Sequence, residues 1–277
     1  MYARHTGTNN NGLRIRGGRN ATEDEFPYVV KLMLPLLKKR KPRNKFICSG
    51  AVLTSKWTLT AKHCIFSVER KLQQQQLSAG VTQIKPVIEY QPSPNSDFAY
   101  SEVTSMSTLP GRINLRMKIL TNDIGLLHTQ PMLFAKYGKL SPIDYAALTG
   151  QAVSMVGYGI MMKRGEKRPL VPQVIDVVVK ECTYKKYHHY PQLCFAPSCS
   201  ARVTVSQSNC PGDSGGPIVH ASGVVGVITA GDNHECFPDS SAEDRYDIGY
   251  DVGTSTPVSP FVDWISTVIT TEIDTRF

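Results

Sequence analysis

The sequence has no apolar run of about eighteen residues, which is the length that a membrane-spanning helix needs. It also has no Cys-x-x-Cys pair, a spacing in which cytosolic proteins with many cysteines often hold a metal. Seven cysteines without such pairs favour an oxidising compartment, and we therefore expect a secreted, extracellular protein. Residues 1–14 nevertheless lack the apolar core of a signal peptide, and we interpret them as a polar leader.

Acidic residues are absent from one strongly basic stretch. The formal net charge is +8, and no Asp or Glu interrupts the basic side chains of residues 38–45, which are Lys38, Lys39, Arg40, Lys41, Arg43 and Lys45. Such a run is usually a solvated loop, but it can also steer a polyanion or an acidic partner. Both interpretations stay open from the sequence.

Long helical patterns are absent before residue 260. Short apolar and β-branched runs recur instead, separated by turn residues, at 28–33, 51–54, 57–60, 152–156, 174–179 and 223–229. This pattern predicts an all-β protein, although it does not distinguish a sandwich from a barrel. After Pro260 the apolar side chains follow a helical spacing and predict a C-terminal helix; they are Phe261, Trp264, Ile265, Val268 and Ile269.

The segment 209–217, Asn-Cys-Pro-Gly-Asp-Ser-Gly-Gly-Pro, is rich in small residues that let a backbone close tightly around one hydroxyl group. We interpret Ser214 as a nucleophile. A serine hydroxyl is weak alone and needs a base to take its proton, together with N–H groups that hold the oxyanion. We expect Gly212 and Ser214 to supply these N–H groups.

Two further segments supply partners for this hydroxyl. His63 ends an apolar run in Leu-Thr-Ala-Lys-His-Cys, and Asp123 begins another in Asn-Asp-Ile-Gly-Leu-Leu. The order His63, Asp123, Ser214 is one of the chain orders in which a Ser-His-Asp triad occurs. A lone His or Asp in such a run would more often be structural, but their joint occurrence favours catalysis.

With Gly-Asp-Ser-Gly-Gly-Pro, these blocks resemble the three signatures of the chymotrypsin-like serine endopeptidases, and the similarity runs from Ile15 to about Ile265. The resemblance implies two six-stranded antiparallel barrels of the chymotrypsin type with a C-terminal helix. We place the barrels at 15–135 and 136–258 and the helix and tail at 259–277. It also implies peptide hydrolysis through an acyl-enzyme. The alternative from another class is a non-catalytic, protease-like binding protein.

The family resemblance implies activation by proteolysis. A cut after Arg14 would free the amine of Ile15, which is expected to pair with the carboxylate of Asp213, so that residues 1–14 form an activation segment. A new ammonium group beside a buried carboxylate can stabilise one loop arrangement. Arg16 departs from the family's usual Val or Ile at this position, and its long side chain must reach outward to solvent.

The resemblance also maps a specificity pocket. Ser208 is expected on its floor and Gly231 on one wall, while Thr229, Ala230 and Gly231 pair with the substrate backbone. An uncharged floor predicts cleavage after a large apolar or aromatic residue. We expect Gly249 on the other wall, where the family usually has a glycine. In the alternative alignment Asp247 lines this wall and would give trypsin-like specificity for a basic residue.

By the same resemblance, Cys48 pairs with Cys64, Cys182 with Cys194, and Cys210 with Cys236. Cys199 is left over, and a bond between Cys194 and Cys199 is the competing arrangement. No cofactor and no metal are expected, since residues 71–85 contain no carboxylate where some family members bind calcium. Expected partners are a protein or peptide substrate, an activating protease and protein inhibitors, without nucleic acid or membrane, and the chain is expected to be a monomer.

Overall fold

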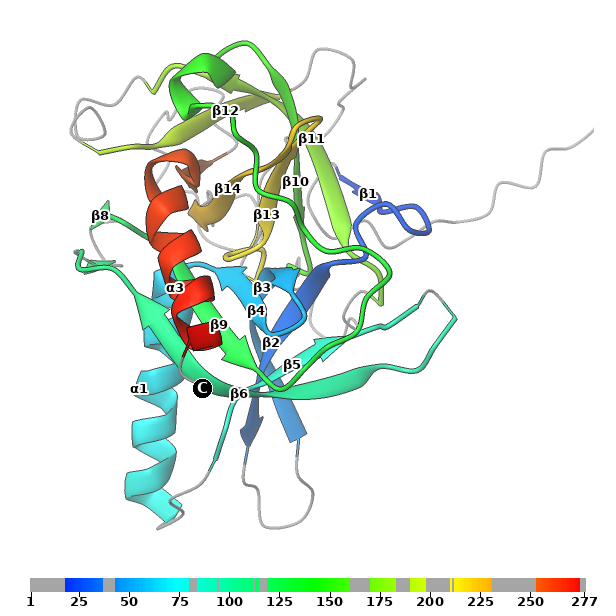
Figure 1. The fold of residues 1–277 in the computed structure, drawn as a ribbon, viewed down its shortest axis with the longest axis vertical. Helices are drawn as coiled ribbons and strands as arrows, with labels where there is room; N and C mark the ends of the chain where they lie inside the picture. Colours follow the sequence, from blue (N-terminus) through cyan, green and yellow to red (C-terminus); the bar gives the residue numbers. More distant parts are fainter. Residues whose placement is uncertain are drawn as a thin grey trace, which may run out of the picture.

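The computed structural model describes residues 18–36, 43–79, 84–93, 95–111, 113–114, 119–159, 170–182, 190–197, 210, 212–230 and 253–274. Strands dominate this part of the chain and form two barrels side by side (Figure 1). No helix among these residues is long and apolar enough to cross a membrane.

The first barrel closes in the order β2-β3-β4-β9-β6-β5 with antiparallel neighbours. Its strands are β2 (Val29–Leu36), β3 (Arg43–Thr54), β4 (Trp57–Thr60), β5 (Val87–Tyr90), β6 (Ala99–Thr108) and β9 (Gly125–Thr129). β2 is almost wholly buried, and its sequence is an apolar run interrupted only by Lys31. β4 is buried at all four residues although its sequence alternates Trp and Leu with Thr.

The second barrel runs β11-β10-β13-β14-β15-β12 and closes through a pairing between β11 and β12. Its strands are β10 (Ala152–Gly157), β11 (Gln173–Lys180), β12 (Leu193–Pro197), β13 (Pro217–His220), β14 (Gly223–Ala230) and β15 (Thr254–Pro257). A short strand near the start of the chain, β1 (Arg19–Asn20), pairs with the outer edge of β11. The N-terminal segment is therefore anchored on the second barrel before the chain enters the first.

The C-terminal segment is helical as predicted: the 3-10 turn η4 (Ser259–Phe261) leads into α3 (Val262–Asp274). Phe261 and Ile265 are buried in the cluster that contains the core of the first barrel, and Trp264 packs against it. The predicted fold class, all-β with two six-stranded antiparallel barrels and a C-terminal helix, is confirmed. The predicted domain boundary near Lys136 lies between β9 and β10 and stays a prediction. Smaller elements are the hairpin β7 (Ile113–Asn114) and β8 (Ile119–Leu120), and the turn η1 (Tyr145–Leu148).

The expectation that no long helix precedes residue 260 is wrong. α1 (Lys62–Ala79) is an 18-residue helix that begins at the residue before His63 and extends beyond the barrel (Figure 1). Only its first turns bury apolar side chains, at Ile65 and Val68, whereas Leu77 is exposed. The rest consists mainly of Glu, Arg, Lys, Leu and Gln, which have high helix propensity. A helix with so little apolar periodicity gives no signal to a pattern search.

Each barrel has a core of its own. Leu148, Met155, Phe195 and their neighbours fill the second barrel, while the larger cluster fills the first and extends across the junction to Val224 and Val227. Phe195 is fully buried in the centre of β12, so its ring contributes a large apolar area to the second core.

Replacing Phe195 by Ala should lower the free energy of unfolding by about 3–5 kcal/mol, because it removes a buried ring and leaves a cavity. Phe66→Ala is the matched control, since Phe66 is 48% exposed on α1. It should change stability by no more than about 0.5 kcal/mol. Urea denaturation of the two variants makes the comparison, and equal losses would contradict this account of the core.

Candidate active site

His63 and Asp123 form a buried pair joined by two hydrogen bonds. The Nδ1–H of His63 donates to Asp123 Oδ2 at 2.8 Å, and the backbone N–H of His63 donates to Asp123 Oδ1, also at 2.8 Å. An ionised carboxylate only accepts hydrogen bonds, so the pair places the proton on Nδ1 and leaves Nε2 as the basic nitrogen. In this arrangement the Asp123 carboxylate orients the His63 imidazole, so that Nε2 can act as a general base.

The backbone around this pair is tied down on both sides. His63 is followed by Cys64, whose disulfide to Cys48 fastens the start of α1 to β3. Before His63, the Nζ of Lys62 donates to the carbonyl oxygens of Leu109 and Gly111, in the loop that faces the aspartate segment.

On the aspartate side, Asn122 adopts a φ of 50°. Its side-chain amide donates to the carbonyl of Pro110 at 2.8 Å. Asparagine tolerates the left-handed region better than most residues, which allows the sharp turn directly before Asp123.

Ser214 lies in a tight turn between Gly212, with φ 105°, and Gly215, with φ 83°. Both φ values are in the region that favours glycine. The N–H of Gly215 donates to Ile228 of β14, so the turn is held against the second barrel. On its other side, a Cβ at Gly215 would overlap Thr60 and crowd Ala61, residues that lead directly to His63. The serine turn of one barrel thus packs on the histidine segment of the other.

The side chains of Ser214 and His63 are both described, and no hydrogen bond joins them. His63 Nε2 instead lies 3.7 Å from Cys64 Sγ. Ser214 is partly exposed, whereas His63 and Asp123 are buried. Hydrogen bonds of catalytic groups are often long in the absence of substrate and shorten when it binds. The site therefore has a positioned base, and the turn that carries Ser214 packs on the segment that leads to this base.

Asp213 is completely buried. Its carboxylate accepts hydrogen bonds from the backbone N–H groups of Gly159, at 2.6 Å, and Cys210, at 2.8 Å. A Cβ at Gly159 would overlap this carboxylate, so only glycine permits the close approach. No cation among the described residues pairs with it. Burial raises the pKa of Asp213 to about 7, although the two N–H donors oppose the shift.

Most of the predicted specificity pocket lies outside the described residues, namely Ser208, Gly231, Gly249 and the alternative Asp247. Of the rest, Thr229 is buried and its hydroxyl group is hydrogen bonded to Thr256 and to the carbonyl of Val227. Ala230 ends β14. Ile15 of the expected activation pair also lies outside the described residues, as do residues 38–42 of the basic stretch, while Arg43 and Lys45 are exposed on β3.

The structure contains the disulfides Cys48–Cys64 and Cys182–Cys194. Cys194 is therefore not bonded to Cys199, which lies outside the described residues. Cys210 is disulfide-bonded as well, and Cys236, its predicted partner, also lies outside them. The ligating atoms of Cys48, His63 and Cys64 lie within 4.8 Å of one another. Because the two sulfur atoms are bonded together, this group offers no thiolate to a metal.

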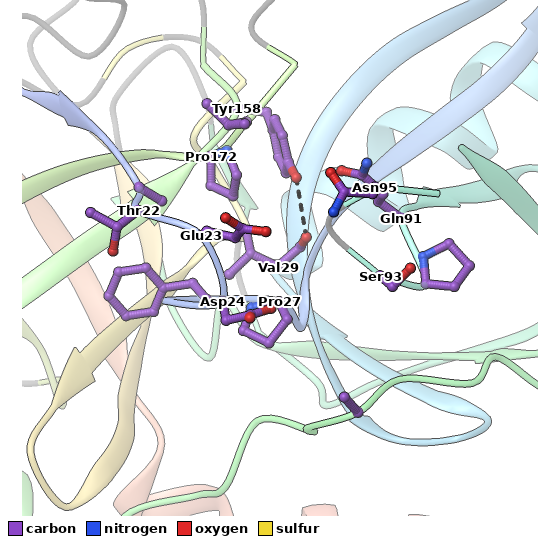
Figure 2. Close-up of a pocket in the computed structure, with 15 residues that line it drawn as sticks. Thr22, Glu23, Asp24, Pro27, Val29, Gln91, Ser93, Asn95, Tyr158 and Pro172 are labelled. Atoms are coloured by element: carbon purple, nitrogen blue, oxygen red, sulfur yellow. Dashed lines mark hydrogen bonds between the residues drawn. The ribbon is translucent and has the colours of Figure 1, made fainter. Parts of the chain in front are cut away.

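A pocket of about 370 Å³ lies away from the His63–Asp123 pair, between the residues after β1 and the loop that joins β5 to β6 (Figure 2). Its lining includes Glu23, Asp24, Asn95 and Tyr158, and the Tyr158 hydroxyl group donates to the carbonyl of Val29 at 3.4 Å. None of His63, Asp123 and Ser214 lines it. The pocket is therefore separate from the candidate active site.

Three residues at the site were not expected from the sequence: Ser49, Tyr158 and Gly159. Gly157 and Gly159 follow a predicted strand, and such glycines often mark a close backbone approach, so they carried a usable signal. The side chain of Ser49 is fully buried beside the serine turn and hydrogen bonds to Gly212. One serine in an apolar strand gives no pattern by which this contact could have been found.

The profile of the family described as Trypsin matches residues 15–265. The chain is 27% identical to CLIP domain-containing serine protease B9 of Anopheles gambiae, over 75% of this chain and 53% of that protein. It therefore spans about half the length of that relative. It is 26% identical to trypsin delta of Drosophila melanogaster, over 79% of this chain and 78% of that one. It is 25% identical to granzyme M of Rattus norvegicus, over 92% of this chain and 89% of that protein.

A solved structure with the same fold is neuropsin, a serine protease expressed in the limbic system of mouse brain. It superposes with a TM-score of 0.62 at 18% identity, over 91% of this chain and 98% of that one. At this identity the likeness concerns the fold alone. The family match covers both barrels, from the segment before β1 to the first turn of α3, and includes the His63–Asp123 pair and the serine turn. The chain belongs to the trypsin family, the chymotrypsin-like serine endopeptidases.

Proposed function

We propose that this chain is a secreted serine endopeptidase in which His63, Asp123 and Ser214 act as the catalytic triad. The observation that carries the proposal is the buried His63–Asp123 pair, with two hydrogen bonds of 2.8 Å, beside a glycine-flanked turn that presents Ser214. Protein substrates follow from the family. Two disulfides and the disulfide-bonded Cys210 in the described part of the chain support an oxidising, extracellular setting.

In this mechanism Ser214 Oγ attacks the scissile carbonyl carbon while His63 Nε2 takes the hydroxyl proton. The N–H groups of Gly212 and Ser214 stabilise the oxyanion, and each such donor is worth about 3 kcal/mol in comparable sites. His63 then gives the proton to the leaving amine as the C–N bond breaks. Water, deprotonated by the same nitrogen, hydrolyses the acyl-enzyme. Asp123 keeps the proton on Nδ1 and stabilises the imidazolium that forms.

Ser214→Ala should lower kcat/KM for peptide substrates by a factor of about 10⁴ or more, because the triad acts as one unit. The matched control is Ser222→Ala, which removes a hydroxyl group that is hydrogen bonded to a different histidine, His220, on the second barrel. Hydrolysis rates and covalent labelling by a peptidyl phosphonate provide the measurements. If Ser214→Ala hydrolyses peptides as fast as the unmodified chain, the proposal is wrong.

We also propose activation by cleavage after Arg14, followed by pairing of the Ile15 ammonium group with Asp213. The register of the strands near Asp213 supports this pairing, because it brings β1 close to the carboxylate. Asn20, Gln173 and Gly157 lie opposite one another across β1, β11 and β10, and a Cβ at Gly157 would contact Asp213. Adjacent strands are about 4.8 Å apart, so this row spans about 10 Å. A few extended residues, at about 3.4 Å each, suffice for the chain before β1 to cover that distance.

The raised pKa of Asp213 makes the uncut chain sensitive to pH. Between its unfolded value of 3.8 and its folded value of about 7, the folded state binds one more proton than the unfolded state. Stability therefore falls as pH rises through this range and stays lower above it. At about 1.4 kcal/mol per pKa unit the loss amounts to about 4 kcal/mol. A buried ammonium partner would lower the pKa of Asp213 and remove this loss.

The uncut chain, made resistant by Arg14→Gln, should lose about 4 kcal/mol of unfolding free energy between pH 4 and pH 8. Chain that is cut after Arg14, as verified by N-terminal sequencing, should lose much less. Asp213→Asn should abolish the difference between cut and uncut protein. Identical pH profiles of the cut and uncut chains, or an active species that begins at Met1 or Gly17, would contradict the activation proposal.

For specificity we propose cleavage after large apolar or aromatic residues. The support is the uncharged Ser208 at the expected pocket floor, which would leave the cation of a bound Arg or Lys desolvated without a partner. The alternative is an Asp247 carboxylate that pairs with a basic side chain. Activating proteases and protein inhibitors are further proposed partners of a monomeric enzyme.

Substrates that differ only in Phe or Arg before the cut should give a higher kcat/KM for Phe, by about tenfold or more, since burying an unpaired cation is costly. Asp247→Asn should leave this ratio unchanged. A preference for Arg that disappears in Asp247→Asn would show that the carboxylate, rather than Ser208, determines the choice.

A further inference from the structure

Ser49 is a polar residue in the middle of β3 with no exposed surface. Cys48 and Gly50, its neighbours in the strand, are also buried. A buried hydroxyl group is costly unless it is hydrogen bonded. The partners of Ser49 therefore indicate what the hydroxyl group does at this place in the fold.

Four hydrogen bonds of 2.9 Å converge on this residue. Its Oγ donates to the carbonyl of Gly212 and accepts from the N–H of Tyr158. Its backbone N–H donates to the carbonyl of Ser214, and its own carbonyl accepts from the Thr60 hydroxyl group. Ser49 thus joins the serine turn, the end of β10 and the strand that precedes His63.

The two carbonyl groups that Ser49 holds belong to Gly212 and Ser214, the residues proposed to supply the oxyanion donors. The backbone N–H of Ser49 donates to the Ser214 carbonyl, and any residue at position 49 except proline could make this bond. The bond to the Gly212 carbonyl comes from the side-chain hydroxyl group and needs the serine. Glycine has no Cβ to restrict its backbone, and Gly212 adopts a φ of 105°. A hydrogen bond to its carbonyl fixes the peptide group between Gly212 and Asp213, and it therefore restricts the rotations at Gly212 that also determine the direction of the Gly212 N–H.

The same hydroxyl group connects this turn to the carboxylate behind it. Tyr158, which donates to Ser49 Oγ, directly precedes Gly159, whose N–H donates to Asp213. The hydroxyl group is thus hydrogen bonded at once to the residue before Asp213 and to the residue before Gly159. A change of residue 49 to Ala would leave the Gly212 carbonyl and the Tyr158 N–H without this partner.

We propose that the Ser49 side chain is a positioning residue for the oxyanion hole, which holds Gly212 in the orientation that aims its N–H at the substrate carbonyl oxygen. This rests on the proposed function, since it assigns a role within the same site. Ser49 does not touch the reacting atoms. It acts through Gly212, so its loss should affect the transition state more than substrate binding.

The test compares Ser49→Ala with Ser101→Ala in the cut, active enzyme. Ser101 is also buried, and its Oγ donates to a backbone carbonyl, that of Gln130 at 2.6 Å, but it lies in β6, away from the serine turn. Ser49→Ala should lower kcat by about 10- to 100-fold, as misplacement of a catalytic donor does, with KM changed less than about twofold. Ser101→Ala should leave kcat unchanged at a comparable thermal stability.

Binding of a peptidyl aldehyde, whose adduct with Ser214 resembles the tetrahedral intermediate, gives a second readout. Its affinity should fall in Ser49→Ala by the same factor as kcat/KM, because both depend on the oxyanion donors. Ser49→Thr keeps the hydroxyl group and should retain most of kcat. An unchanged kcat in Ser49→Ala, an effect confined to KM, or an equal loss in Ser101→Ala would overturn the proposal. So would failure of both Ser49→Ala and Ser49→Gly to fold, since Ser49 would then be needed for folding itself.

Failure of this inference can be told apart from failure of the proposed function. An unmodified, cut chain without Ser214-dependent hydrolysis would refute the function. An active chain that tolerates Ser49→Ala would refute only the role of Ser49. Crystal structures of the two proteins provide a readout independent of activity: the Gly212 carbonyl should turn away from residue 49 in Ser49→Ala alone, and an unmoved carbonyl would count against the proposal.

Discussion

The buried carboxylate of Asp213 is the constraint on which the arrangement of the site depends. It lies at the junction of the barrels with two backbone N–H groups as hydrogen-bond donors and no cation beside it among the described residues. A Cβ at position 157 or 159 would overlap this carboxylate, so the end of β10 can pass beside it only with glycine at both positions. The turn that follows, with Ser214, is therefore determined as much by the end of β10 as by its own sequence.

The residues proposed as the catalytic triad come from both barrels, and the packing of the serine turn on the histidine segment brings them together. The first barrel supplies His63 and Asp123 through the ends of β4 and the segment before β9, while Ser214 precedes β13 of the second. Of the hydrogen bonds across the junction, the one from the Ser49 N–H to the Ser214 carbonyl uses main-chain groups only, whereas the two made by the Ser49 hydroxyl group use a side chain. A main-chain contact of this kind depends little on side-chain identity, which is consistent with relatives about one quarter identical that match the same family.

Elements with a strong local pattern could be predicted from the sequence, and elements determined by distant contacts could not. The run 57–60 coincides with β4, and the apolar spacing after Pro260 corresponds to α3. β12 and β15 were missed because they are short and carry Cys, Ser, Thr and Pro among few apolar residues. α1 was missed because its stability comes from helix propensity and a few buried contacts near its start. The proposed triad residues were predicted from three local motifs, whereas Ser49 is hydrogen bonded to groups more than 100 residues away in the chain and belongs to no such motif.

Lys31 extends the link between the barrels beyond the site. It lies in β2, almost fully buried, and its Nζ contacts Glu89 at 2.8 Å. The same ammonium group lies over the rings of Phe98 and Tyr158, 4.5 and 4.7 Å from their centres. Tyr158 comes from the second barrel, so a charge of one barrel is stabilised partly by an aromatic ring of the other. The barrels are therefore not exchangeable modules: a chimera that took its first barrel from a relative would have to keep the cation and the ring matched, or leave a buried charge without its full set of partners.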